Sequence, residues 1–185
     1  MGKLVAFAAS LFFLSGCASA ETGESLKATF DAGVAAYDAG DYSTAFKTWS
    51  SIDDQDLAAM RNIALMLRKG QGVEKDPKAA EEMYQRAADA GLPTAQADLA
   101  DMLLKGEAGP PDPERALPLL QAAAAADHPI AEFELAQMYE KGELVPKDLS
   151  VARNLYAAAA AHGMEEAKTR LDGLEPKPPL RGPEP

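Results

Sequence analysis

The chain has 185 residues and carries 18 Lys and Arg against 29 Asp and Glu, which gives a formal net charge of −11. An acidic protein of this kind repels nucleic acid and anionic lipid, so neither is expected as a partner. The only cysteine is Cys17, which excludes internal disulfides, haem attachment and sites built from several thiolates. Stability must therefore come from packing.

The first residues have the pattern of an export signal. Lys3 gives a basic start, and an apolar run of 11 residues follows at 4–14. A helix that spans a bilayer needs about 20 residues, so this run is too short for one. Residues 14–17 read Leu-Ser-Gly-Cys, which resembles the lipobox of bacterial lipoproteins.

The lipobox resemblance implies that residues 1–16 are a signal peptide and that Cys17 is lipidated. Ala18 favours the outer membrane, with the protein facing the periplasm, because enteric bacteria retain lipoproteins in the inner membrane through Asp at that place. Residues 17–25 are then expected to form a polar tether, which would reach roughly 25–30 Å if fully extended. The alternative is an ordinary signal cleaved after Ala20, which leaves a soluble periplasmic protein.

A first helical hairpin is expected over residues 26–54. Phe30, Gly33 and Tyr37 recur at helical spacing, residues 39–42 form a tight turn, and Ala45 belongs to a second apolar stripe. The segment resembles a tetratricopeptide hairpin, a family in which small residues at the places of Gly33 and Ala45 allow the two helices to touch.

The rest of the chain repeats with a period of 36 residues. The repeat is carried by Ala59, Ala95, Ala131 and Ala167, by the Lys-Gly pairs that begin at Lys69, Lys105 and Lys141, and by Asp76, Asp112 and Asp148. A period of this size predicts stacked helical hairpins, none of which can bury its apolar face without a neighbour. The fold class is therefore all-α, an α-α superhelix.

Three full units are expected, at residues 57–92, 93–128 and 129–164. A half-unit at 165–174 is expected to cap the stack, and the proline-rich tail at 175–185 is expected to be disordered. Pro118 falls inside the second helix of the middle unit, which predicts either a kink or a helix that begins after Pro113.

The units resemble the Sel-one-like repeat, a relative of the tetratricopeptide repeat. In the first unit the resemblance is carried by Ala59, Ile63, Leu67, Gly70, Gly72, Asp76, Ala80, Tyr84, Ala87 and Gly91. The middle unit departs from the pattern, with Leu120 in place of the tyrosine and Asp127 in place of the closing glycine. The resemblance covers most of residues 30–171 and implies a right-handed solenoid of helical hairpins.

Candidates for catalysis or metal binding are few. His128 and His162 are the only histidines, and each lies in a turn, with neither a cysteine nor a second histidine on one helix face to complete a zinc site. The three repeated aspartates each precede an expected helix, so helix capping explains them better than calcium binding or acid–base chemistry. The sequence therefore predicts no metal, no cofactor and no catalytic residue.

The working surface is expected on the concave side, which the first helix of each unit lines in tetratricopeptide-like stacks. The resemblance places there Phe30, Val34, Tyr37, Arg61, Leu65, Arg68, Ala97, Asp101, Leu104, Phe133, Gln137 and Glu140. Aromatic and Arg side chains dominate interface energetics, and Arg61 and Arg68 suit a carboxylate of a partner. The alternative is that these side chains pack between repeats.

These features indicate a non-catalytic scaffold or adaptor that binds a protein or peptide in a bacterial cell envelope, attached to the membrane by its lipid. The alternative is an envelope hydrolase acting on β-lactams or peptidoglycan fragments, as described for cysteine-rich members of the repeat family. That alternative lacks its cysteines here, because none follows Cys17.

Overall fold

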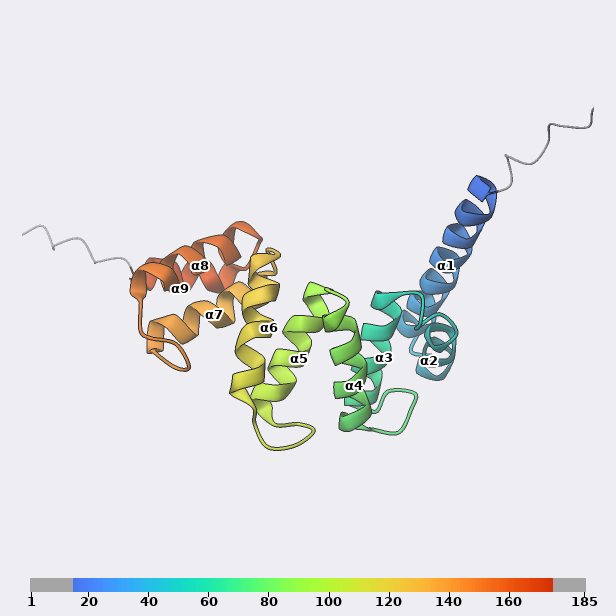
Figure 1. Ribbon diagram of the computed structural model, residues 1–185, viewed down its shortest axis with the longest axis horizontal. Helices are drawn as coiled ribbons and strands as arrows, with labels where there is room; N and C mark the ends of the chain where they lie inside the picture. Colours follow the sequence, from blue (N-terminus) through green and yellow to red (C-terminus); the bar gives the residue numbers. More distant parts are fainter. Residues whose placement is uncertain (1–14, 175–185) are drawn as a thin grey trace, which may run out of the picture.

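A computed structural model describes residues 15–174, and they form a curved row of helical hairpins (Figure 1). The helices are α1 Ser15–Asp38, α2 Tyr42–Ser50, α3 Leu57–Lys69, α4 Pro77–Asp89, α5 Pro93–Lys105, α6 Pro113–Ala125, α7 Pro129–Lys141, α8 Leu149–Ala161 and α9 Glu165–Leu174. No strand occurs within this range, so the prediction of an all-α helical-repeat superhelix is confirmed. Residues 1–14 and 175–185, which hold most of the expected signal peptide and the whole tail, lie outside the described part.

The first helix is longer than expected. It begins at Ser15, so residues 17–25, expected as a tether before the first hairpin, belong to the same helix as residues 26–38. This segment contains no proline, and its two Ala and two Glu residues have high helix propensity. Within residues 15–174, every helix is too short or too polar to span a membrane.

The repeated aspartates are helix caps, as predicted. Asp76 accepts a hydrogen bond from the Ala79 backbone N–H at 3.0 Å, and Asp112 and Asp148 head their helices in the same way. Helices α3, α5 and α7 each end at a glycine, Gly70, Gly106 and Gly142, with φ of 70°, 65° and 79°. A left-handed residue closes a helix at little cost only when it lacks a Cβ, so the Lys-Gly pairs fix where these helices stop.

Pro118 lies inside helix α6, which begins at Pro113, so the prediction of a later start is wrong. Proline at this place leaves the carbonyl of Glu114 without its usual donor. Glu114 and Pro118 are both exposed, so water can satisfy that carbonyl.

The hairpins pack through small residues. The alanines that carry the period are fully buried, each with 0% exposure: Ala59, Ala95, Ala131 and Ala167 on the first helices, and Ala80, Ala116 and Ala152 on the second helices. Side chains of this size let helix backbones approach closely, and each helix then contacts the next along the chain. The buried residues form three clusters along the stack, and these are joined by partly buried side chains that neighbouring clusters share, Leu67 and Met83 at one junction and Tyr139 and Leu155 at the other.

One large residue per unit fills the space that the alanines leave. Tyr84, Leu120 and Tyr156 stand 36 residues apart, and each is 0% exposed. The Tyr156 hydroxyl donates to a carboxylate oxygen of Glu140 at 2.6 Å, whereas the Tyr84 hydroxyl is buried without a partner. Burial, together with the Glu140 carboxylate, raises the pKa of Tyr156 above its ordinary value.

In the first hairpin, Gly33 of α1 lies against the indole ring of Trp49 in α2. A Cβ at position 33 would clash with that ring. The ring cannot move aside cheaply, because its Nε1 donates to the Phe30 carbonyl at 3.2 Å. The sequence prediction that Gly33 allows two helices to touch is thereby confirmed.

Gly33→Ala is expected to lower the free energy of unfolding by about 1–3 kcal/mol, the cost of overpacking a core. The direction of the change in the free energy of unfolding is diagnostic, because Gly→Ala at an open helix position stabilises by about 1 kcal/mol. Gly23→Ala in the same helix is the matched control, since no atom lies within 4 Å of its added Cβ. Urea unfolding followed by circular dichroism measures both, and a gain at both positions would contradict the close contact.

Tyr156→Phe is expected to destabilise the protein by about 1–2 kcal/mol, because it removes a hydrogen bond to a carboxylate. Tyr84→Phe removes a buried hydroxyl that has no partner, so it is expected to leave the stability unchanged or to increase it. The two variants delete the same atom at equivalent places. Equal losses in chemical denaturation would show that the two hydroxyls have similar surroundings.

Candidate functional site

Two arginines of α3 hold the neighbouring repeat. The Arg61 Nε donates to Asp98 at 2.6 Å, and Arg68 donates to Asp101 at 2.6 Å and to Glu107 at 2.7 Å. We call the surface formed by α1, α3, α5 and α7 the A-helix face. Arg61 and Arg68 lie on it, but the expectation that they are free to meet a carboxylate of a partner is wrong, because acids of the next unit already pair with both.

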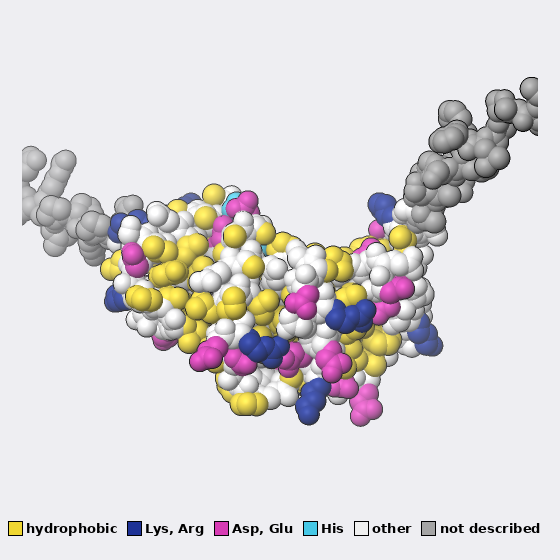
Figure 2. All heavy atoms as spheres, viewed as in Figure 1, with side chains coloured by type: hydrophobic (Ala, Val, Ile, Leu, Met, Phe, Trp, Pro, Cys, Tyr) yellow, Lys and Arg dark blue, Asp and Glu magenta, His cyan; other side chains and the backbone are white. Residues whose placement is uncertain are grey.

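These pairs are partly shielded from solvent, which strengthens them. Burial acts to raise the pKa of Asp101, but hydrogen bonds from Lys105 and Arg68 hold it below its ordinary value. The Arg68 side chain is 13% exposed, so solvent screens this pair less than it screens a pair on the open surface. Elsewhere, Lys and Arg side chains lie beside Asp and Glu side chains on the face drawn in Figure 2, with apolar patches between them.

A first cavity on the A-helix face has a volume of about 190 Å³. It is lined by Val34, Tyr37, Trp49, Arg61, Asn62 and Leu65. The structure therefore brings together four residues of the predicted binding surface, Val34, Tyr37, Arg61 and Leu65. The Tyr37 ring packs edge-on against Tyr42, with its hydroxyl donating to the Gln71 side chain at 3.0 Å. The walls are largely aromatic and aliphatic and are held in place.

A second cavity, of about 290 Å³, opens between α3, α5 and α7. It is lined by Arg61, Thr94, Ala97, Asp98, Asp101, His128, Ile130 and Glu134. Arg61 is common to both cavities, so they adjoin along the A-helix face. The second cavity combines acidic side chains with an apolar residue, Ile130, that is 50% exposed.

Other predicted surface residues are used for packing. Phe133 is 8% exposed and stacks edge-on against Tyr156 at 5.5 Å, so its expected place in an open groove is wrong. It stands in register with Arg61 and Ala97, but the cap helix α9 closes the stack beside it through Ala167 and Leu171.

Phe30, Leu104, Gln137 and Glu140 are half-buried and line neither cavity. Phe30 packs on Trp49 with ring centroids 6.1 Å apart, and Leu104 packs on the core. Glu140 is occupied by its hydrogen bond from Tyr156. These four residues therefore support the A-helix face rather than form its cavities.

Glu134 is the functional candidate that the sequence reasoning missed. Its Oε2 is buried and has no hydrogen-bond partner. Burial, reinforced by the nearby Asp101 carboxylate, raises the pKa of Glu134 to about 7. One signal was present in the sequence: Asn62, Asp98 and Glu134 stand 36 residues apart, so this register position is polar in every unit although it adjoins the core.

The histidines have structural partners. The Nδ1 of His128 accepts from the Ala131 backbone N–H at 3.4 Å and caps α7. His162 pairs with Glu132 at 2.9 Å, and the carboxylate of Glu132 is 3% exposed. This hydrogen bond to Glu132 raises the pKa of His162. Asp127, Glu132 and His162 form the one group of three possible metal ligands found in residues 15–174. Their ligand atoms lie within 4.8 Å of one another, so these residues could hold a metal ion.

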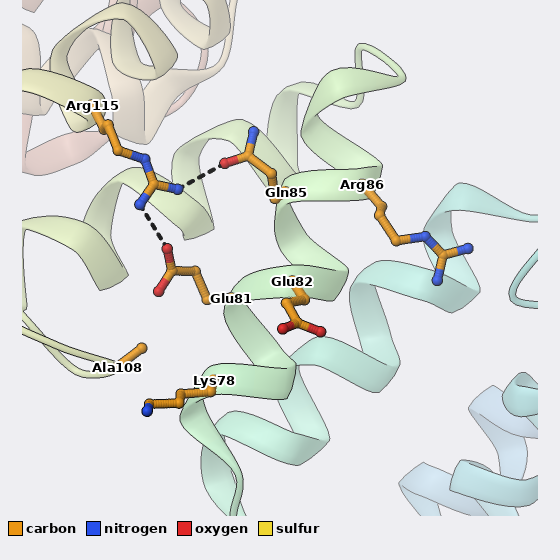
Figure 3. Close-up of a pocket in the computed structure, with 7 residues that line it drawn as sticks. All are labelled: Lys78, Glu81, Glu82, Gln85, Arg86, Ala108 and Arg115. Carbon is orange, nitrogen blue, oxygen red and sulfur yellow. Dashed lines mark hydrogen bonds and ion pairs between the residues drawn. The ribbon is translucent and has the colours of Figure 1, made fainter.

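A larger cavity, of about 580 Å³, lies on the second helices between α4 and α6 (Figure 3). Arg115 reaches from α6 to Glu81 at 2.8 Å and to Gln85 at 2.9 Å. Figure 3 shows that Arg86 points away from Arg115, so the basic side chains do not converge on one place. We therefore regard this cavity as a seam between repeats, and the A-helix face as the better candidate site.

Comparison with known proteins agrees with this architecture. The family model of the Sel1 repeat matches this chain three times, at residues 57–92, 93–128 and 129–164. The Sel1 repeat protein from Oxalobacter formigenes is 34% identical, with a TM-score of 0.74 over 77% of this chain and 58% of that one. No match was found among curated proteins.

Two further solved structures are similar. The protective antigen c5321 of uropathogenic Escherichia coli, described as an SLR fold, is 25% identical with a TM-score of 0.72 over 84% of this chain and 34% of that one. The immunity protein Pa5087 of Pseudomonas aeruginosa is 25% identical with a TM-score of 0.60 over 80% and 58%. The chain thus spans a third to three fifths of the length of these relatives. With three matched repeats and the stacked hairpins described above, the chain belongs to the Sel1 repeat family.

Proposed function

We propose that this protein is a non-catalytic scaffold or adaptor that binds a protein or peptide along its A-helix face. Proteins of the Sel1 repeat fold generally mediate protein–protein interaction, which gives the coarse assignment. The finer assignment to this face rests on one observation, the two adjoining cavities that share Arg61.

The two cavities differ in chemistry, and this supports recognition of a specific sequence. The cavity beside Tyr37 and Leu65 suits an apolar or aromatic side chain, which gains binding free energy by leaving water. The cavity beside Asp98 and Glu134 is polar and acidic. An extended segment that crosses from α3 to α5 would place successive side chains in the two cavities.

The site is also rigid in the way that a binding surface requires. Arg61 and Arg68 connect α3 to α5 at 2.6 Å each, so the wall between the cavities is fixed before a partner arrives. A preformed surface avoids the entropy of ordering loops upon binding. The charged side chains therefore serve to shape the surface, which favours binding rather than bond chemistry.

We place this activity in a bacterial cell envelope. The support is the pattern of the first residues, an apolar run that ends in Leu-Ser-Gly-Cys with Cys17 as the lipid acceptor. Several acyl chains on one cysteine give stable anchoring, whereas one chain is marginal. The anchored protein would present the A-helix face to envelope partners near the membrane.

Photocrosslinking in intact cells tests the binding face. A benzophenone amino acid at position 130 is expected to form a discrete adduct with a partner, and Leu65→Glu in the same chain is expected to abolish that adduct. The same probe at position 149 is the matched control, because Ile130 and Leu149 are 50% and 44% exposed and Leu149 begins the second helix α8. Equal adducts at both positions, or an adduct that survives Leu65→Glu, would count against the A-helix face.

Metabolic labelling with an alkyne palmitate analogue tests the anchor. The wild-type protein is expected to take up label and to fractionate with membranes, and Cys17→Ser is expected to lose both. Absence of label on the wild-type protein, with a mature N-terminus after Ala20, would favour the soluble periplasmic alternative. Label that persists in Cys17→Ser would refute lipidation at this cysteine.

A further inference from the structure

The repeat register makes Glu134 an acid that has lost its cation. Asp98 in the second unit pairs with Arg61 in the first at 2.6 Å. A shift of 36 residues carries this pair onto Glu134 and Ala97. The acid is retained, but the arginine is replaced by an alanine that is 6% exposed. The volume of a long basic side chain is therefore missing between α5 and α7.

The ion pair between Arg68 and Asp101 is lost in a different way in the next unit. The same shift carries Arg68 and Asp101 onto Leu104 and Gln137, so there the cation and the acid are both replaced by neutral residues. The shift also carries Glu107, the other partner of Arg68, onto Glu143, which has Lys141 at 3.6 Å. Glu134 is therefore the retained acid whose buried oxygen has no partner.

The cavity of about 290 Å³ lies where that arginine is missing. The liquid volume of one water is about 30 Å³, so the space is much larger than a single water molecule needs. Glu134 lines it, and the Oε2 of Glu134 is buried without a hydrogen-bond partner. Ile130 and Ala97 supply apolar wall beside the acid.

The other charges around the cavity are balanced. From α3 come Arg61 and Arg68, and from α5 come Asp98, Asp101 and Lys105, with Glu107 in the loop that follows. These are three cations and three carboxylates, all engaged in ion pairs. On the side of α7, His128 accepts a hydrogen bond through Nδ1, and burial lowers its pKa, so it supplies no cation. An ionised Glu134 is the charge left over.

From this geometry we propose that the cavity between α3, α5 and α7 is a subsite for one lysine or arginine side chain of the bound partner, with its cationic head group paired to Glu134. The inference rests on the proposed function, because it assigns the partner chemistry of one part of the A-helix face. Lys and Arg have apolar stems and charged ends, which match the walls at Ile130 and Ala97 and the acid behind them. A carboxylate of the partner would instead meet Asp98, Asp101 and Glu134.

Binding of a cation at Glu134 is coupled to release of a proton. In the free protein the pKa of Glu134 is about 7, and a cation in the cavity lowers it. Affinity is then fully present only well above pH 7, where the carboxyl is already ionised. It falls as the pH drops below about 7, by at most about tenfold per pH unit for one proton.

Two peptides test the subsite with the full chain: acetyl-Trp-Ala-Ala-Lys-Ala-amide, and the same peptide with norleucine in place of lysine. At pH 8 the lysine peptide is expected to bind about tenfold more tightly in an NMR titration, as for a hydrogen bond to a charged group. Glu134→Gln is expected to remove this preference. Glu114→Gln, an equal charge change at an exposed place on α6, is expected to keep it.

The stability of the free protein gives a second readout. Because the pKa of Glu134 is raised in the folded state, its ionisation opposes folding. This loss of stability grows as the pH rises from the ordinary pKa of 4.5 to about 7. Glu134→Gln is therefore expected to raise the melting temperature at pH 8 and to leave it unchanged at pH 4. A carboxylate that merely stabilised the fold would make the same variant less stable at pH 8.

Ala97→Arg restores the missing arginine within the chain. It is expected to raise the melting temperature at pH 8 through a pair with Glu134, and Glu134→Gln in the same chain is expected to cancel that gain. The filled cavity is also expected to lose its preference for the lysine peptide. A lower melting temperature that does not depend on Glu134 would contradict the register argument.

The failures of the two proposals can be distinguished. Equal binding of the two peptides to the wild-type protein, or binding of neither, overturns the subsite, while the adduct at position 130 still decides whether the A-helix face binds a partner. NMR shifts at Glu134 that MgCl₂ produces and the lysine peptide does not would make the cavity a cation site and overturn the proposal. Loss of the adduct as well would overturn both.

Discussion

The structure depends on how closely the helices approach at the buried alanines. Ala59, Ala95 and Ala131 are each 0% exposed, so a larger side chain at these places would have to displace its close-packed neighbours. The two helices of each hairpin pack on each other, and the hairpin covers the rest of its apolar surface against its neighbours, as in other repeat stacks. This constraint fixes the orientation of each unit relative to the last, and hence which side chains of one unit face those of the next.

The helix arrangement repeats from unit to unit while the side chains at equivalent positions differ, and the cavity beside Glu134 results from one such difference. The pair between Arg61 and Asp98 satisfies both partners at 2.6 Å, so the first junction is closed. The second junction has the same register, but Ala97 stands in the place of the arginine. The cavity beside Glu134 is thus a departure from the repeat, at a place where Ala97 fills less space than an arginine would.

Local signals in the sequence predicted the helices. The ion pairs between residues far apart in the sequence could not be predicted. Asp76 caps an N–H three residues away, and Gly70 ends α3 through its own φ, so both can be inferred from a few neighbouring letters. Arg61 and Asp98 are 37 residues apart, and only their placement on adjacent helices shows that they pair. Phe133 was misplaced because a rule for an inner repeat was applied beside the end of the stack, where α9 covers it.

An unpaired acid in a rigid cavity also carries a cost to stability that selection on folding alone would remove. Burying a polar atom without a partner opposes folding, and a neutral residue at position 134 would avoid this. Gln137 shows that this chain does use a neutral residue where the matching arginine is absent. The acid at 134 therefore has no evident benefit to the free protein. A bound cation removes the cost of burying an unpaired carboxylate at position 134. The free energy recovered in this way adds to the free energy of binding.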